Sequence, residues 1–203
     1  MYVVFVTGGL ASGKKTVCEL LGKAGATVLD LDAIAKEEQE DEQILAQLTE
    51  AFGDDLLNAN GTLDRRLLAE RAFATPEDAE RLNSICWPAV SERLSDIVLG
   101  GGCQMRNSNE LVVVEIPLLV ESGGFRDLAD EVICVVAHED IRRARAQARG
   151  MSPADVENRL ALQATAAERI AISDVVIENN DSLAALEEQV NGWLAAHRAR
   201  LEL

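Results

Sequence analysis

The hydrophobic positions of this chain gather into five short aliphatic runs that predict the strands of a sheet. Each run is continuously apolar rather than alternating, which is typical of parallel strands covered by helices on both faces. Amphipathic stretches with helical spacing separate the runs, as a doubly wound α/β sheet requires. The runs lie at residues 3–7, 27–31, 111–116, 131–136 and 174–178.

Helical patterns follow the first run and also close the chain. The first helix should begin in the glycine-rich stretch after residue 7 and end near Gly22 or Gly25. The last should span about residues 182–200, with Ser182 as its N-cap. Its apolar positions recur at helical spacing, at Leu183, Leu186, Val190 and Leu194.

A long connection, at about residues 33–110, separates the second and third runs. Connections in compact domains are commonly a few residues long. This one has helical patterns at 41–52, 63–73 and 76–99, with breaks at Gly53 and at residues 58–61, and it ends in a flexible polar loop at 100–109. We expect residues 1–203 to form a single domain with a helical insertion, either a substrate subdomain or a simple helical elaboration.

The glycine-rich stretch after the first run predicts a phosphate site. Gly8, Gly13 and Lys14 fit the pattern G-x4-G-K-S/T, in which backbone N–H groups wrap phosphates and the lysine reaches the terminal ones. Glycine permits the backbone angles and the close approach, and the start of the following helix attracts anions. The residues expected to bind nucleotide are Gly9, Leu10, Ala11, Ser12, Gly13, Lys14, Lys15 and Thr16.

Lys15 breaks this pattern, because a Ser or Thr hydroxyl that holds Mg²⁺ is expected there. In one interpretation, water, ATP oxygens and other carboxylates hold the metal, since Mg²⁺ commonly keeps several waters. In the other, Lys15 takes over the electrostatic role of the metal, or metal binding is impaired. Thr16 is a poor substitute, because one residue displaces it by about 100° around a helix.

Carboxylates follow two of the predicted strands. Asp30 and Asp32 lie at the carboxyl end of the second run, where ligands of open α/β sheets bind. Strand alternation would place both on one side, with one accepting a hydroxyl proton and the other orienting water or metal. Asp32 could equally cap the following helix. Glu115 ends the third run like a Walker-B element that holds a metal-bound water, or it is a surface acid.

Four arginines, at positions 142, 143, 145 and 149, fall within eight residues. Arg145 and Arg149 are four residues apart and share one face of a predicted helix. Such a helix could form a mobile lid that neutralises a transferring phosphoryl group, or a solvated basic face paired with nearby acids.

The composition narrows the partners. A formal net charge of −16 argues against a nucleic-acid surface. It indicates a self-repelling surface. We also expect a monomer or a weak homo-oligomer. We see no membrane span and no signal peptide. The cysteines, Cys18, Cys86, Cys103 and Cys134, lack metal-ligand spacing, Cys18 and Cys134 fall in apolar patterns that suggest burial, and a reduced, cytoplasmic protein is expected.

These motifs together resemble the dephospho-coenzyme A kinase family, collinearly over nearly the whole chain. The Pro-Leu-Leu-x-Glu segment at residues 117–121 and the spacing of all the pieces are more specific than the phosphate loop. The matching segments lie at residues 7–14, 28–32, 52–53, 61–68, 73, 82–88, 116–121, 145–152, 159–163 and 174–180.

The resemblance implies that the γ-phosphate of ATP is transferred to the ribose 3′-hydroxyl of dephospho-CoA, with Mg²⁺. It implies a three-layer P-loop fold with sheet order 2-3-1-4-5, a helical CoA-side insertion and an arginine-bearing lid at about residues 142–166. Asp32 matches the general base, with Asp30 as its neighbour, Lys14 and Arg149 match charge-stabilising groups, and Arg145 and Asn179 match the nucleotide side. The acceptor side matches Arg65, Pro117, Leu118, Leu119 and Glu121.

Several residues depart from the family pattern. Lys15 replaces a usual Ser, Ala11 a common Gly, Trp87 the His of a His-Pro pair, and Arg169 a common Lys. Two other functions therefore stay open: a non-catalytic nucleotide or CoA sensor, and a kinase for another small nucleoside or nucleotide. A GTPase is disfavoured because the sequence lacks an Asn-Lys-x-Asp guanine signature.

Overall fold

The structure, a computed structural model, describes residues 1–99, 110–122 and 126–201. The predicted polar loop at residues 100–109, which contains Cys103, lies outside the described residues. The chain divides into two compact units. The first comprises Met1–Asp30 and Val98–Leu203, and the second comprises Leu31–Ile97.

The first unit is built on a parallel sheet of five strands in the order β2-β3-β1-β4-β5, which confirms the expected fold. The central strand β1 pairs with β3 on one side and with β4 on the other. The strands are β1 (Tyr2–Gly8), β2 (Thr27–Asp30), β3 (Leu111–Glu115), β4 (Glu131–Val136) and β5 (Val175–Glu178).

The two edge strands differ from the prediction. The three inner strands are buried nearly throughout, but Val28 on β2 is 41% exposed and Val176 on β5 is 40% exposed. Cover on both faces, inferred from their continuous apolar character, is therefore wrong for the edges. An apolar run cannot by itself distinguish an inner strand from an edge strand, because both favour β-branched residues.

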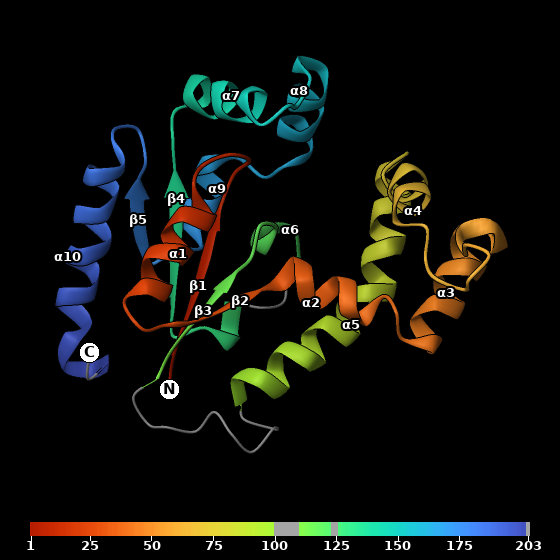
Figure 1. Cartoon of the computed structure of the whole chain (residues 1–203), viewed down its shortest axis with the longest axis horizontal. Coiled ribbons are helices and arrows are strands. Elements are labelled where there is room, and N and C mark those ends of the chain that lie inside the picture. Colours follow the sequence, from red (N-terminus) through yellow and green to blue (C-terminus); the bar gives the residue numbers. More distant parts are fainter. Residues whose placement is uncertain (100–109, 123–125, 202–203) are drawn as a thin grey trace. The chain divides into compact units, whose positions relative to one another are not determined.

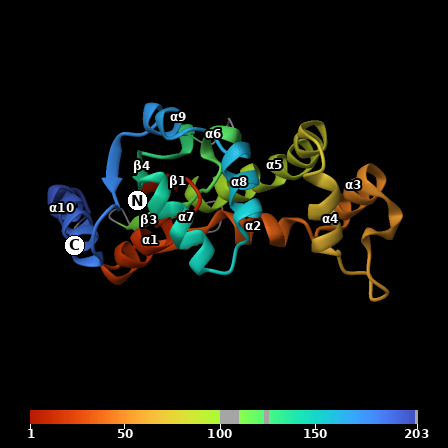
Figure 2. The ribbon, with the colours of Figure 1, turned by 90° about the horizontal axis from the view of Figure 1, so that it is seen from above.

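Helices cover both faces of the sheet (Figures 1 and 2). On one face α1 (Lys14–Lys23) packs against α10 (Leu183–Leu201), and their apolar side chains meet those of β1, β3 and β4 in one core. On the other face α9 (Ala166–Ala171) packs on β1 and β4, with α6 (Leu119–Ser122) beside it. Ser182 caps α10 as predicted, since its Oγ accepts from the Ala185 N–H over 3.3 Å.

Two further helices, α7 (Glu139–Ala148) and α8 (Pro153–Leu162), lie beyond the carboxyl ends of the strands (Figure 1). The opposite end of the sheet is tied together by Glu131, the first residue of β4. Its carboxylate accepts from the Tyr2 hydroxyl at 2.9 Å and from the Trp193 indole at 3.2 Å, and it pairs with His197 at 3.0 Å. Glu131 thus joins β1, β4 and α10 at the amino ends of the strands.

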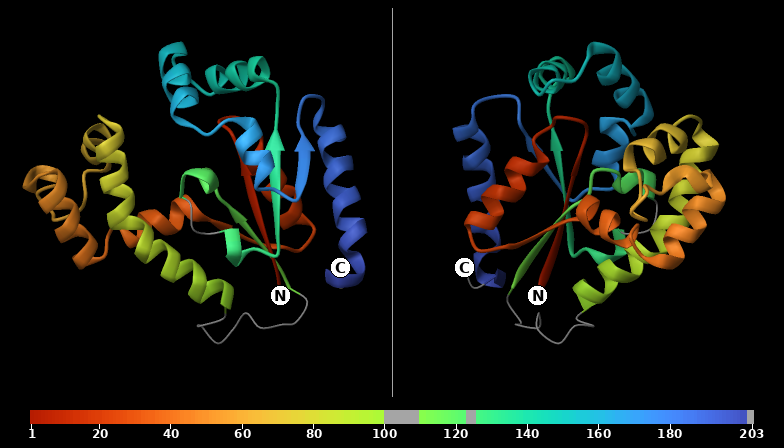
Figure 3. Two further views of the ribbon diagram at one scale, coloured as in Figure 1. Left: turned by 180° about the vertical axis from the view of Figure 1, so that it is seen from behind. Right: turned by 45° about the vertical axis from the view of Figure 1, so that its right-hand side comes forward.

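The second unit consists of helices (Figure 3). They are α2 (Leu31–Glu38), α3 (Glu42–Phe52), the short 3-10 helix η1 (Asp54–Leu56), α4 (Arg65–Ala72) and α5 (Pro76–Leu99). The three helices predicted in this segment are confirmed, and α5 has the predicted bounds. Asp41 and Asp64, which the prediction placed inside these helices, are instead the N-caps of α3 and α4, because each carboxylate accepts two backbone N–H groups.

Within the described ranges, no helix is long and apolar enough to cross a membrane. The described cysteines, Cys18, Cys86 and Cys134, are unpaired thiols and all are buried. The predicted burial of Cys18 and Cys134 is confirmed.

Candidate active site

The phosphate loop connects β1 to α1 and ends in Gly13, the N-cap of α1. Gly13 has a φ of +107°, and a Cβ there would lie 2.1 Å from Nδ2 of Asn179. Ala11 also has a positive φ, +56°, in the left-handed region that favours glycine. A glycine at this position, as the family resemblance suggests, would adopt that conformation without steric strain.

Lys14 folds over its own loop. Its Nζ donates to the carbonyl oxygens of Gly8 at 2.8 Å and Gly9 at 3.2 Å. The ammonium therefore lies on the loop that precedes α1, where the first N–H groups of the helix and its dipole already favour an anion.

Asn179 connects the end of β5 to this loop. Its side-chain amide donates to the Ser12 carbonyl at 2.8 Å. Arg145, from α7, donates to the Asn179 backbone carbonyl at 3.0 Å and to its Oδ1 at 3.3 Å. The two residues predicted on the nucleotide side are thus in contact, although 34 residues separate them.

A surface hollow of about 160 Å³ lies beside these residues. An amide, two guanidinium groups, one carboxylate and two leucines contribute to its lining. The two cations outnumber the single acid, which suits a polar, anionic ligand with a flat ring. The residues that line it are Gly13, Thr16, Arg145, Arg149, Asn179, Asp181, Leu183 and Leu186.

The other two arginines of the cluster, Arg142 and Arg143, contact different parts of the protein. Arg142 donates through Nε to the Leu10 carbonyl at 2.9 Å. Burial first, and the charge of Arg169 second, hold the pKa of Arg142 below its usual range. Arg143 instead pairs with Glu139 on its own helix and with Glu157 on α8. The solvated-face interpretation therefore describes Arg143 but not Arg142 or Arg145.

Asp30 and Glu115 are register partners at the carboxyl ends of β2 and β3. Burial is the main cause that raises the pKa of the Cys18 thiol, and the charges of Glu115 and Asp30 raise it further while Lys14 lowers it. Cys18 lies on α1, so the charges of both carboxylates act on the helix that follows the phosphate loop.

The structure corrects two expectations for Asp32. The strand ends at Asp30 and α2 begins at Leu31, so Asp32 lies in the first turn of a helix, in the second unit. Asp32 is not on the strand, so strand alternation does not place it on the same side as Asp30. The capping alternative fails because Asp32 lies inside the helix rather than before it.

The donor set fits a magnesium ion without supplying a full coordination shell. Across the described residues there is no cluster of three or more His, Cys, Asp or Glu side chains that could hold a metal. Asp30 and Glu115 are nevertheless two paired carboxylates, and Mg²⁺ is usually held by one or two carboxylates together with phosphates and water. Lys15 is exposed and offers no oxygen ligand.

The residues expected on the acceptor side make contacts of their own. Arg65 donates to Gln39 Oε1 at 2.7 Å and to the Lys36 carbonyl at 2.8 Å, and it pairs with Glu40 at 2.6 Å. Pro117 and Leu118 are half-buried and Leu119 is buried, at the junction of β3 and α6.

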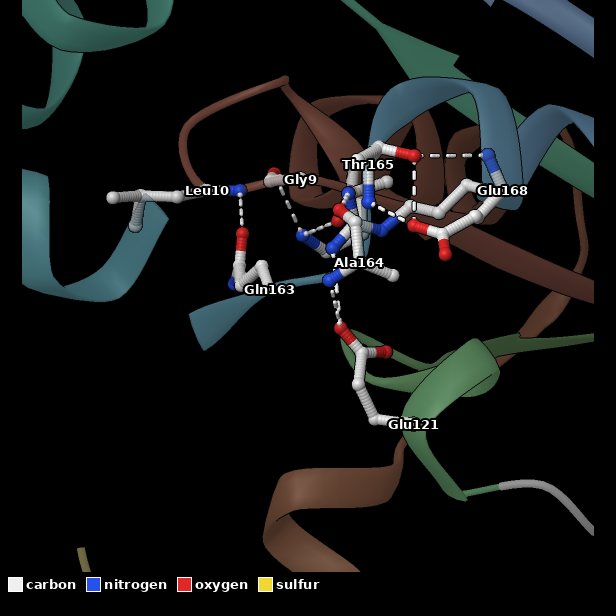
Figure 4. A network of polar contacts seen from close by, with 10 residues as sticks. Gly9, Leu10, Glu121, Gln163, Ala164, Thr165 and Glu168 are labelled. Carbon is white, nitrogen blue, oxygen red and sulfur yellow. Dashed lines mark hydrogen bonds and ion pairs between the residues drawn. The ribbon is translucent and has the colours of Figure 1, made fainter. Parts of the chain in front are cut away.

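Glu121 accepts from the Ala164 N–H at 2.8 Å and from Arg169 at 3.3 Å (Figure 4). Arg169 is only 1% exposed and also donates to the Ala164 carbonyl. Sequence reasoning missed this pairing, and it also missed Gln163, whose Oε1 accepts from the Leu10 N–H at 2.8 Å. The available signals were the position of Gln163 in a matching segment and the Arg at position 169.

Comparison with known proteins identifies the family. A family model described as dephospho-CoA kinase matches residues 2–185. A dephospho-CoA kinase of Corynebacterium jeikeium is 38% identical over 195 residues, which cover 95% of this chain and 98% of the relative.

Solved structures agree in fold. The crystal structure of TT1252 from Thermus thermophilus has a TM-score of 0.78 and 33% identity, covering 96% of this chain and 97% of that chain. A dephospho-CoA kinase from Campylobacter jejuni has a TM-score of 0.71 and 24% identity, covering 98% and 96%, and at that identity it supports the fold alone. The chain therefore belongs to the dephospho-CoA kinase family of ATP-dependent kinases.

Proposed function

We propose that this protein transfers the γ-phosphate of ATP to the ribose 3′-hydroxyl of dephospho-CoA, the last step of coenzyme A synthesis. Family membership supports the activity. The observation that carries the donor half is the position of Lys14, whose ammonium lies on the carbonyls of Gly8 and Gly9 at the start of α1. A cation beside the N–H groups of a helix start is suited to a triphosphate.

Phosphoryl transfer requires mainly positioning and charge neutralisation. We assign the phosphates to the backbone of residues 9–16 and to Lys14. The adenine lies against Asn179 in this proposal, which the hollow lined by Gly13, Thr16 and Asn179 supports. Arg145 and Arg149 supply positive charge to the transferring group, and the helices at about residues 142–166 act as a lid.

For the metal, we propose that Asp30 and Glu115 hold Mg²⁺ through water. When bound, the ion would neutralise charge on the phosphate oxygens. The pairing of these carboxylates at the strand ends supports the assignment. Water takes the place of the missing Ser or Thr hydroxyl at Lys15, since Mg²⁺ retains several waters in most protein sites.

For the acceptor, we assign Asp32 as the general base that takes the proton of the 3′-hydroxyl. Its carboxylate is exposed on the first turn of α2, which supports access to a substrate. Arg65 and the segment 117–121 bind dephospho-CoA in this proposal, and Glu121 contributes by ordering its neighbours. Changing Asp32→Asn should lower kcat by about 100-fold or more. Asp54→Asn, at an exposed acid of the same unit, should leave kcat unchanged.

The direct test is a coupled ADP-release assay with ATP, Mg²⁺ and dephospho-CoA. Mass spectrometry of the product should find the acceptor with one added phosphoryl group. A Lys14→Ala variant provides the background. If a folded wild-type sample turns over no faster than that background, the proposal is refuted. Faster turnover with another nucleoside or nucleotide would reassign the acceptor.

A further inference from the structure

Leu10 is held from outside the phosphate loop at both of its polar backbone groups. Its N–H donates to Gln163 Oε1 at 2.8 Å, and its carbonyl accepts from Arg142 Nε at 2.9 Å (Figure 4 shows the Gln163 contact). Backbone groups of a loop usually bond to neighbours or to water. Here side chains 153 and 132 residues further along the chain take both.

The backbone next to Gln163 is anchored, because both polar backbone groups of the following residue, Ala164, make hydrogen bonds to side chains. The Ala164 N–H donates to Glu121 Oε1 at 2.8 Å, and the Ala164 carbonyl accepts from Arg169 Nη1 at 2.5 Å. Arg169 is almost completely buried and pairs with Glu121 at 3.3 Å. Gln163 and Ala164 thus connect the phosphate loop to Glu121 on α6. Arg169 strengthens this connection, because it contacts both Ala164 and Glu121.

Arg142 is held equally closely. Its guanidinium covers Gly9 so tightly that a Cβ there would lie 2.7 Å from Nη2. In the same loop, Ala11 packs with Ala146 of α7 and Val156 of α8 in a small apolar cluster, against which Leu10 also packs. Arg142 and Gln163 thus contact both polar backbone groups of Leu10 from the two ends of the proposed lid segment, and together they favour one conformation of Leu10.

We propose that Gln163 and Arg142 are positioning residues of the donor site, which fix Leu10 and thereby preset the phosphate loop for ATP. The inference rests on the proposed function only in taking this loop as the ATP site. A loop that is ordered before binding does not lose that conformational freedom when the ligand binds, so affinity is gained without a new contact to the ligand. The two side chains act through Leu10 rather than on the phosphates.

The test is ATP affinity, measured by calorimetry without an acceptor. Gln163→Met keeps the length of the side chain but removes the oxygen that accepts from Leu10. It should raise the Kd for ATP and for ADP by about 5-fold, the effect of one lost hydrogen bond. Arg142→Met should raise both by about 10-fold or more, whereas Arg142→Lys, which retains a donor and the charge, should recover most of the affinity.

Arg143→Met is the matched control. It removes the same charge from the same helix, at a side chain paired with Glu139 and Glu157 instead of the loop. Its Kd for ATP should change less than about 2-fold. The melting temperature of each variant and its KM for dephospho-CoA should stay near the wild-type values, which separates positioning of the loop from general stability.

Unchanged ATP affinity in Gln163→Met would overturn the proposal. So would tighter binding, which would mean that Gln163 competes with phosphate for the Leu10 N–H. If Arg143→Met lost as much ATP affinity as Arg142→Met, the effect of Arg142 would come from net charge alone, and its role as a positioning residue would be overturned. Because binding is measured without an acceptor, a failure to phosphorylate dephospho-CoA would refute the proposed function and leave this result interpretable.

Discussion

The side-chain amide of Asn179 donates to the Ser12 carbonyl over 2.8 Å, joining the end of β5 to the phosphate loop 167 residues earlier. The same amide nitrogen occupies the space beside Gly13 that a Cβ would need. Glycine at this position therefore serves two purposes, because the backbone has a positive φ and the neighbouring Asn179 approaches closely.

Replacing Gly13 by alanine should consequently damage the site. Gly13→Ala imposes a left-handed conformation that costs roughly 1–2 kcal/mol, in addition to the clash with Asn179. We expect ATP affinity to fall by at least about 10-fold, measured by calorimetry. Gly192→Ala is the control, because a Cβ there meets nothing within 4 Å on the exposed side of α10. It should leave ATP affinity unchanged and raise stability by about 0.5–1 kcal/mol. Equal ATP affinity in the two variants would contradict the prediction.

Arg169 gives a prediction about stability. Arg169→Met leaves Glu121 without its buried cation, so the free energy of unfolding should fall by about 3 kcal/mol in urea denaturation. Arg169→Lys keeps the charge but loses part of the hydrogen bonding, so the free energy of unfolding should fall by only about 1 kcal/mol. Arg81→Met, at an exposed pair with Asp78, should cost less than about 1 kcal/mol. The prediction fails if Arg169→Met costs no more than Arg81→Met.

The buried thiol of Cys86 predicts a dependence of stability on pH. Burial raises the pKa of this thiol above its ordinary value of 9.0, although Gln39 lowers it somewhat. Above pH 9.0 the unfolded chain loses the proton while the folded chain retains it, so stability falls as pH rises. The contribution of the protonated Cys86 thiol to the free energy of unfolding is fully present below pH 9.0, and it declines by up to about 1.4 kcal/mol per pH unit above that pH.

Cys86→Ala isolates this effect, because the other buried thiols remain in both proteins. The variant should be about 1 kcal/mol less stable than wild type at neutral pH, from lost packing. That deficit should shrink as the pH rises to about 10.5, because only the wild type has the Cys86 proton to lose on unfolding. A deficit that stays constant in urea denaturation over this range would show that the Cys86 thiol does not titrate as expected.

Lys15 gives a prediction about the metal. If water replaces the usual hydroxyl ligand, Lys15→Ser should lower the Mg²⁺ concentration for half-maximal activity by about 5-fold, since it restores an oxygen ligand. Lys23→Ser removes the same charge from the last turn of the same helix and should leave the Mg²⁺ midpoint unchanged. Superimposable Mg²⁺ titrations of wild type and Lys15→Ser would refute the coupling between this position and the metal.

Much of the fold could be predicted because its signals are local. The aliphatic runs located all five strands, and the phosphate loop followed from residues adjacent in the chain. The bounds of α5 were predicted correctly, because Pro76 opens it and the apolar spacing continues to Leu99. The sheet order came from the family resemblance, because nothing in a run of valines specifies which strand lies beside it.

Asp32 illustrates where local reasoning fails. The alternating Leu-Asp-Leu-Asp stretch is compatible with a strand, yet α2 begins at Leu31. Hydrophobic periodicity over four residues cannot distinguish the end of a strand from the first turn of a helix. Packing of Leu31 and Ile34, both buried, favours the helical conformation at this point.

The sequence by itself determined the strands, most of the helices and the phosphate loop, because hydrophobic period and glycine conformation are properties of short segments. Tertiary structure alone decided that Gln163 and Arg142 hold Leu10, that Glu121 pairs with buried Arg169, and that Arg143 lies apart from its neighbours. These contacts join residues up to 153 positions apart. They exist because the carboxyl ends of parallel strands meet at one edge of a sheet, which no local pattern can specify.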